Sequence, residues 1–111
     1  MQIQQPTCAI LADRHTALIE GMRDLLESTF ESVYMVADLS SLRNGAQRLL
    51  PDLIILDFSL VGRDLPGLLQ RVADLSPSSR VIVLTVHDEP AVTRLALSAG
   101  VSAQNISIAT G

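Results

Sequence analysis

The residues with the chemistry of a phosphate or metal site come directly after short apolar runs. Asp13 and Arg14 follow the first run, Asp57 ends the third and Thr85 ends the fourth. A carboxylate at the end of an apolar strand is costly unless a polar group meets it. The ligand site of an open α/β sheet lies outside the carboxyl ends of its strands. We therefore expect Asp13, Asp57 and Thr85 to converge, although Asp57 taken alone also fits a helix cap or a solvated loop position.

The apolar runs alternate with longer stretches of helical period, which is the pattern of βα units around a parallel sheet. This pattern predicts strands at residues 8–12, 32–37, 52–57 and 80–85, and helices at residues 16–28, 39–49, 65–75 and 90–99. Residues 58–64 are predicted to form a loop. Residues 101–107 are a weaker candidate for a fifth strand, because Gln104 and Asn105 interrupt the apolar pattern.

The composition indicates one small acidic domain with an aliphatic core. The chain has 111 residues, of which 48% are hydrophobic and 3% aromatic, and its formal net charge is -4. This length fits a single domain over residues 1–111. The negative charge argues against direct contact with nucleic acid, and no apolar run approaches the roughly 20 residues that a membrane span needs. With no secretion signal visible at the start, we expect a cytoplasmic protein.

Several classes of chemistry are excluded or disfavoured by residue type. All eight basic residues are arginines, so no lysine is available for a Schiff base or a phosphate-loop contact. His15 and His87 have no second pair of ligands at a suitable spacing for zinc, and Cys8 reads as a small core residue. The turn after the first apolar run contains no glycine, so a flavodoxin-like enzyme or ligand-binding domain is only a remote alternative.

Three stretches give the sequence a specific resemblance to a known family. They are residues 11–15 (LADRH), 51–60 (PDLIILDFSL) and 80–89 (RVIVLTVHDE), and residues 96–100 (ALSAG) support them at the expected place. Together they resemble the receiver domains of two-component response regulators, with the character of NarL/FixJ-like, LuxR-type transcription regulators. The resemblance covers residues 7–107.

This resemblance implies a fold and a set of roles. The family fold is a flavodoxin-like (CheY-like) doubly wound parallel sheet of five strands in the order 2-1-3-4-5, in agreement with the α/β pattern above. By the resemblance, Asp57 is the phosphoacceptor for a sensor histidine kinase and Thr85 is the switch hydroxyl. Asp13 belongs to the acidic pocket, which holds Mg²⁺ together with Asp57.

The sequence also departs from the family at residues that matter for this chemistry. Arg14 stands where the family has a carboxylate that binds the metal directly, and Ser107 stands at the position of the family's lysine. Gln104 replaces an aromatic residue, and the proline and glycine of the loop after the phosphoacceptor are displaced. A guanidinium at Arg14 would repel Mg²⁺ and compete for the same carboxylates, so we expect it to pair with Asp57.

These departures lead to two functional hypotheses. In the first, the chain is a degenerate receiver with impaired phosphorylation that acts mainly through contacts with a histidine kinase or another signalling protein. In the second, Asp57 is a working phosphoacceptor phosphorylated by a histidine kinase. Neither hypothesis makes the chain an enzyme, and both predict no cofactor beyond a weak Mg²⁺ site at Asp13 and Asp57.

The end of the sequence carries one further expectation. After residue 107 only four residues remain, so the family's final helix is expected to be missing, as is any effector domain. The sheet face beside Leu18, Met22 and Leu25 would then be uncovered, and exposed apolar patches usually mark interfaces. We therefore expect a homodimer.

Overall fold

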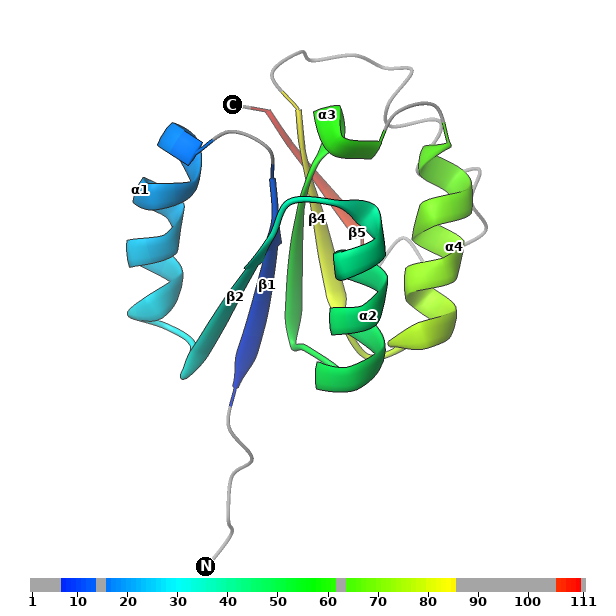
Figure 1. The fold of residues 1–111 in the computed structure, drawn as a ribbon, viewed down its shortest axis with the longest axis horizontal. Coiled ribbons are helices and arrows are strands. Elements are labelled where there is room, and N and C mark those ends of the chain that lie inside the picture. The colour runs from blue at the N-terminus through cyan, green and yellow to red at the C-terminus, as the bar shows by residue number, and fades with distance from the viewer. Residues whose placement is uncertain (1–6, 14–15, 62–63, 86–105, 111) are drawn as a thin grey trace, which may run out of the picture.

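Five parallel strands form a single sheet. The computed structural model describes residues 7–13, 16–61, 64–85 and 106–110, with the backbone alone described at 16–20, 61, 85 and 106–110. The strands are β1 (Cys8–Ala12), β2 (Ser32–Val36), β3 (Leu53–Asp57), β4 (Arg80–Thr85) and β5 (Ile106–Thr110). They lie in the order β2-β1-β3-β4-β5 (Figure 1), which confirms the expected doubly wound topology.

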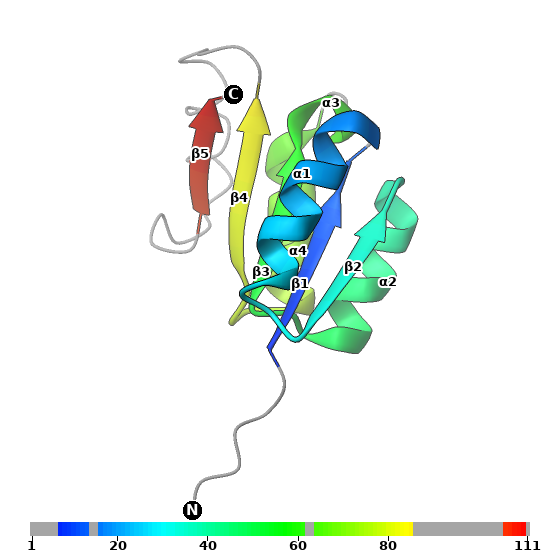
Figure 2. The ribbon, with the colours of Figure 1, turned by 90° about the vertical axis from the view of Figure 1, so that its left-hand side faces the viewer.

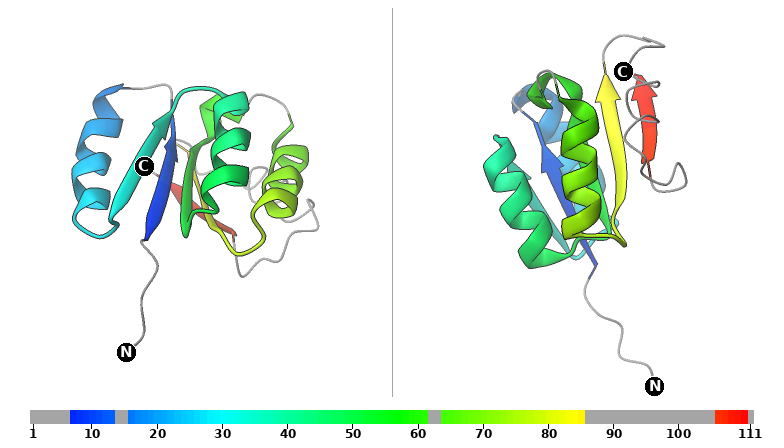
Figure 3. Two further views of the ribbon diagram at one scale, coloured as in Figure 1. Left: turned by 60° about the horizontal axis from the view of Figure 1, so that its bottom comes forward. Right: turned by 90° about the vertical axis from the view of Figure 1, so that its right-hand side faces the viewer.

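Helices cover the sheet from both sides. They are α1 (Thr16–Glu27), α2 (Leu39–Leu49), the short α3 (Phe58–Val61) and α4 (Leu65–Leu75). Figure 2, viewed from the side of α1, shows this helix in front of the strands, and Figure 3 shows α2 and α4 together on the opposite side. No helix in the described part of the chain has the length and apolar character of a transmembrane segment.

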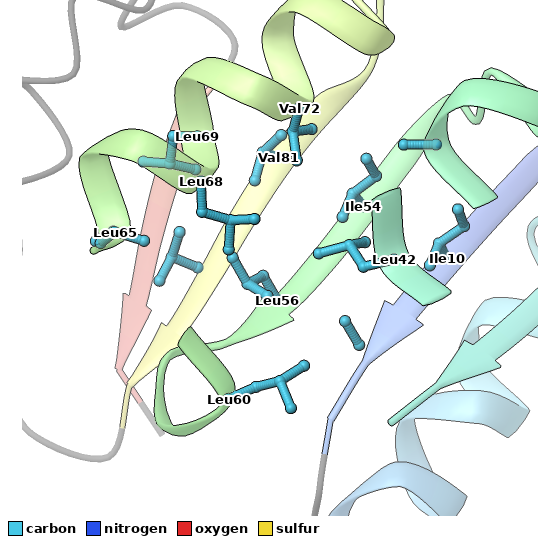
Figure 4. Packing of buried hydrophobic residues seen from close by; sticks show 13 residues of the cluster. Ile10, Leu42, Ile54, Leu56, Leu60, Leu65, Leu68, Leu69, Val72 and Val81 are labelled. Atoms are coloured by element: carbon cyan, nitrogen blue, oxygen red, sulfur yellow. The ribbon is translucent and has the colours of Figure 1, made fainter. Parts of the chain in front are cut away.

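The larger core lies between the sheet and the helices α2 and α4. Strand residues that point to this side alternate with residues that point to α1, because successive side chains of a strand face opposite ways. Figure 4 shows the packing of this cluster. Its buried members are Ile10, Ala12, Leu42, Ala46, Ile54, Leu56, Leu60, Leu65, Leu68, Leu69, Val72, Val81 and Val83. A smaller cluster of Leu11, Leu26 and Ile55 lies on the α1 side.

Aspartates begin the two long helices on that larger core. The Asp38 carboxylate accepts a hydrogen bond from the backbone N–H of Ser41 at 2.7 Å, and Asp64 accepts one from Gly67 at 3.0 Å. These contacts satisfy helix N–H groups that have no partner within the helix. The hydrogen bonds from Ser41 also lower the pKa of Asp38. At Gly67 any Cβ would collide with the Asp64 carboxylate, so glycine permits this cap.

One predicted loop differs from the sequence-based expectation. Residues 58–64 were expected to be a loop, but α3 occupies the first four of them. The helical turn forms because it buries Leu60 against the main core and because Asp57 caps its start. The helix expected at residues 90–99 lies outside the described residues.

The fifth strand begins later than expected. It runs over Ile106–Thr110, three residues past the predicted end, and residues 101–105 lie outside the described residues. The alternation of Ile106 and Ile108 with small residues suits a strand better than the preceding Gln104 and Asn105. The strands at 32–37 and 52–57 are each one residue shorter than predicted, and α1 ends one residue earlier.

Candidate functional site

The carboxyl ends of the central strands bring the expected polar residues to one edge of the sheet. Ala12 of β1 pairs with Leu56 of β3, so the residues that follow them, Asp13 and Asp57, are level with each other. Thr85 is the last residue of β4, one position beyond the partner of Asp57. The strand register therefore brings the backbone positions of these three residues to one edge of the sheet.

Asp13 lies at the buried end of β1. Its side chain and backbone are 2% exposed, and its N–H donates to the carbonyl oxygen of Val36 in the neighbouring β2 at 3.1 Å. This hydrogen bond extends the β1–β2 pairing by one step. A carboxyl group is thereby held at a water-poor position, where its interactions with neighbouring charges are stronger than in solvent.

Asp57 is half-buried and is held by Ser59, two residues further along the chain. Its Oδ1 accepts a hydrogen bond from the Ser59 N–H at 3.1 Å, and its Oδ2 accepts one from the Ser59 Oγ at 2.5 Å. The second contact has the length of a charge-assisted O–H···O⁻ hydrogen bond. Each oxygen of the Asp57 carboxylate is therefore engaged by the same serine.

Sequence analysis did not single out Ser59. The available signal was its spacing, since an aspartate often accepts hydrogen bonds from the residue two positions later. That spacing also occurs at many ordinary turns. Only the structure, in which Asp57 ends β3 and α3 begins at the next residue, shows that this contact falls on the candidate phosphoacceptor.

Two described carboxylates lie where a Mg²⁺ ion would bind in the family. Mg²⁺ requires near-octahedral oxygen ligands. The sheet edge offers the carboxylates of Asp13 and Asp57, and both oxygens of Asp57 already accept hydrogen bonds from Ser59. Across the described residues, no three His, Cys, Asp or Glu side chains are grouped to hold a metal ion.

Other residues named in the sequence analysis lie away from this edge or outside the described residues. Ser107 pairs with Ile82 inside β5, whereas Thr110 pairs with Thr85 at the edge. In this register β5 continues to Thr110, so Ser107 lies within the strand and three residues before its end. Arg14, His15, His87 and Gln104 lie outside the described residues, as does the expected contact between Arg14 and Asp57.

Cys8 lies at the opposite edge of the sheet, at the start of β1. It is partly exposed, not fully buried as its apolar neighbours suggested. Its N–H donates to the Asp52 carboxylate at 2.8 Å. Burial, and after it the negative charge of Asp52, raise the pKa of the Cys8 thiol. The thiol is therefore held in its less reactive protonated form.

Comparison with known proteins identifies a family. The family model for the response regulator receiver domain matches residues 9–104. The nitrate/nitrite response regulator protein NarL of Escherichia coli (strain K12) is 33% identical over 100 residues. That match covers 86% of this chain and 46% of NarL, so the chain spans about half the length of this relative.

Solved structures share the fold. The receiver domain protein (CheY-like) of Methanospirillum hungatei JF-1 has a TM-score of 0.76 at 19% identity, covering 94% of this chain and 82% of that one. The signal receiver domain of the putative response regulator NarL from Mycobacterium tuberculosis has a TM-score of 0.73 at 24% identity, covering 95% and 85%. At these identities the likeness establishes the CheY-like fold.

Proposed function

The chain belongs to the response regulator receiver domains of two-component signalling, and on that premise we propose that it is a degenerate receiver with impaired phosphorylation at Asp57. It acts mainly through contacts with a sensor histidine kinase or another signalling protein. By this proposal it has no enzymatic activity of its own and works in the cytoplasm, without direct contact with nucleic acid or membrane.

The observation that carries the proposal is the lack of lysine. The sequence contains none, and the five residues of β5 are Ile, Ser, Ile, Ala and Thr. Phosphoryl transfer depends on cations and fixed donors that neutralise charge on the transferred group. Without the family's ammonium group, charge on a phosphoryl group at Asp57 is less well compensated.

Arg14 also supports the proposal, through its expected effect on Mg²⁺ binding. It follows Asp13 in the sequence, at the position where the family supplies a carboxylate to Mg²⁺. By the resemblance, this exchange replaces a metal-binding carboxylate with a positive charge, and like charges at short range repel. Together with the lack of a third grouped metal ligand among the described residues, this supports weak Mg²⁺ binding at best.

One observation favours a second candidate function. Asp13, Asp57 and Thr85 all lie at one edge of the sheet, as a working phosphoacceptor site requires. In this alternative a histidine kinase phosphorylates Asp57 despite the substitutions. NarL, by its name a nitrate/nitrite response regulator, is about twice as long as the matched region. The process that a phosphorylated form of this chain would regulate is therefore part of this alternative proposal.

Acetyl phosphate with Mg²⁺, followed by intact mass measurement, separates the two candidates. We expect little or no added phosphoryl mass under conditions that load an ordinary receiver run in parallel. Asp57→Asn provides the blank for modification at other residues. A near-complete mass shift that disappears in Asp57→Asn would reject the degenerate reading and establish the working phosphoacceptor.

Substitutions that restore the family's carboxylate and lysine test whether their replacement impairs phosphorylation. Isothermal titration with Mg²⁺ is expected to show weak binding by the unmodified chain and tighter binding by Arg14→Asp. Thr110 is the register partner of Thr85, whereas Ser107 is the register partner of Ile82, so Thr110→Lys and Ser107→Lys introduce a lysine at two different levels of β5. Each lysine substitution is combined with Arg14→Asp. We expect the double variant with Thr110→Lys to gain more phosphoryl mass than the double variant with Ser107→Lys. Tight Mg²⁺ binding by the unmodified chain would contradict the proposal.

Self-association stays a prediction of this proposal. On the α1 side of the sheet, Leu53, Ile82 and Leu84 are partly buried around the small cluster of Leu11, Leu26 and Ile55. Light scattering over a range of protein concentrations is expected to report a dimer. A monomer at the highest concentration would remove dimerisation from the proposal.

A further inference from the structure

Strand β2 lies at the outer end of the sheet and carries no charged residue. Its sequence is Ser-Val-Tyr-Met-Val, and among the described residues β1 is the only strand paired with it. Figure 2 shows β2 at one margin of the sheet and β5 at the other. Proteins usually protect an edge strand with charged side chains or proline, because its outward N–H and C=O groups can pair with a strand of another chain. Strand β2 contains neither kind of protection.

The backbone groups of β2 alternate in direction along the strand. The Ser32 N–H donates to the carbonyl oxygen of Thr7, which precedes β1, at 3.1 Å. At the other end, the Val36 carbonyl oxygen accepts the N–H of the residue that follows β1, also at 3.1 Å. Every second residue of β2 therefore bonds toward β1. The N–H and C=O groups of Val33 and Met35 point to the opposite side, which is the outer edge.

The exposed side chains of β2 are large and uncharged. Tyr34 and Met35 are each 44% exposed, and they lie on opposite faces of the sheet because successive side chains of a strand alternate. Tyr34 is the only tyrosine of the chain and the middle residue of the five in β2. The residues with outward backbone groups are its two neighbours, so the edge is symmetric about Tyr34.

We propose that the outer edge of β2 pairs antiparallel with β2 of a second copy of this chain, about a two-fold axis at Tyr34. In this register Val33 of each copy faces Met35 of the other, and their outward N–H and C=O groups form hydrogen bonds. The two copies of Tyr34 face each other as a non-hydrogen-bonded pair, in which the side chains are closest. The inference rests on the self-association included in the proposed function, and it assigns that association to the edge of β2 instead of the α1 side.

Charge favours a second copy in this register. The formal net charge of the chain is -4, so two copies repel each other unless the interface keeps acidic residues apart. A two-fold axis at Tyr34 places Glu31 opposite Ala37, and Asp38 opposite Phe30. An axis between Tyr34 and the next residue would place Glu31 opposite Asp38 and would set outward backbone groups against inward ones. The register that matches the backbone groups therefore also separates the nearest carboxylates.

Cysteine cross-linking tests the register. Tyr34→Cys is made together with Cys8→Ser, because Cys8 is the only native cysteine. Cysteines that face each other in a non-hydrogen-bonded pair have the Cα separation that a disulfide needs. We expect oxidation by dissolved oxygen to link Tyr34→Cys into a covalent dimer. Met35→Cys in the same background is the matched control, equally exposed but away from the axis, and it should stay unlinked.

Charge exchange at the axis tests the contact without a covalent bond. Tyr34→Glu and Tyr34→Lys each set like charges against each other, so light scattering should find either variant monomeric. An equimolar mixture of the two should form a dimer, which shows that both variants remain folded. Leu25→Glu, at a 71% exposed position of α1, should keep the wild-type dimer.

Three results would overturn the inference. They are a monomeric wild type, a dimer that persists in both Tyr34→Glu and Tyr34→Lys, and faster cross-linking of Met35→Cys than of Tyr34→Cys. Loss of the dimer in Leu25→Glu alone would place the interface on the α1 side and would also reject the proposal. Phosphoryl loading of Asp57 is measured separately, so an efficiently loaded wild type would refute the degenerate function and leave the β2 interface to be decided by these variants.

Discussion

Two serines at opposite edges of the sheet make the same kind of contact in different surroundings. Ser59 is exposed and donates its hydroxyl to Asp57 at the carboxyl ends of the strands, at 2.5 Å. Ser79 is 3% exposed and donates its hydroxyl to the Pro51 carbonyl at the amino ends, also at 2.5 Å. The Ser79 oxygen lies 2.5 Å from the Ser76 oxygen, which is buried too.

The amino-end edge is built from contacts between segments distant in sequence. Asp52 donates its N–H to the Cys8 carbonyl at 2.8 Å and accepts the Cys8 N–H on its carboxylate. Its own carbonyl accepts the Arg80 N–H at 3.0 Å. One residue therefore joins the starts of β1 and β4. At the site edge, by contrast, the Ser59 contact to Asp57 spans two residues and is open to water.

The two edges are therefore expected to contribute differently to stability. Water cannot replace the buried Ser79 hydroxyl, so its loss should lower the free energy of unfolding. An exposed hydroxyl can be replaced by water, so the site edge can change its hydrogen bonds at little cost. The following predictions test this contrast, beginning with the largest expected effect.

Ser79→Ala is expected to lower the free energy of unfolding by about 1–3 kcal/mol, because it leaves the buried Pro51 carbonyl and the Ser76 hydroxyl without this partner. Urea titration followed by circular dichroism measures the change. Ser78→Ala, at the exposed neighbouring position, controls for the turn. A loss as small as that of the control would show that the buried contact is not the source of stability at this edge.

Leu50→Gly should raise the free energy of unfolding by about 1 kcal/mol. Leu50 ends α2 in the left-handed region, at φ 45° and ψ 60°, where a side chain is strained and glycine is not. The leucine side chain is 60% exposed, so little packing is lost. Thermal unfolding provides the measurement, with Leu49→Gly, inside the helix, as a destabilising comparison. A lower melting temperature in Leu50→Gly would contradict the assigned strain.

Ser59→Ala is expected to change the free energy of unfolding by no more than about 0.5 kcal/mol, the usual range for an exposed substitution. The same urea titration used for Ser79→Ala provides the value, so the two edges are compared directly. If Ser59→Ala cost as much as Ser79→Ala, the contrast between the edges would fail.

The smallest effect concerns the pH dependence of Cys8. Because its folded pKa is raised above the ordinary value of 9.0, the folded state favours the protonated thiol, and the associated stability is lost as the pH rises through the folded pKa. Iodoacetamide should therefore alkylate Cys8 more slowly at pH 8 than an unstructured cysteine peptide. Asp52→Asn should accelerate the reaction, because it removes the nearby negative charge. Equal rates in the wild type and Asp52→Asn would show that Asp52 has no influence on the thiol.

The sequence by itself determined the element types and the available chemistry. Residues 39–49 and 65–75 have a helical period, and residues 8–12 and 80–85 are apolar runs. These patterns predicted two helices and two strands, because periodicity decides which face of a segment can be buried. The match to receiver motifs predicted the strand order. Residue types alone also established that no lysine is present and that Arg14 follows Asp13.

Only the tertiary structure decided which of these residues meet. The helical turn of α3 depends on burying Leu60 against strands and helices distant in sequence, so local pattern predicted a loop there. The β5 register, which puts Thr110 and not Ser107 beside Thr85, depends on hydrogen bonds to β4. The contact between Asp52 and Cys8 spans 44 positions. A one-dimensional pattern describes what each segment can bury, whereas pairing between distant segments is set by the topology that brings them together.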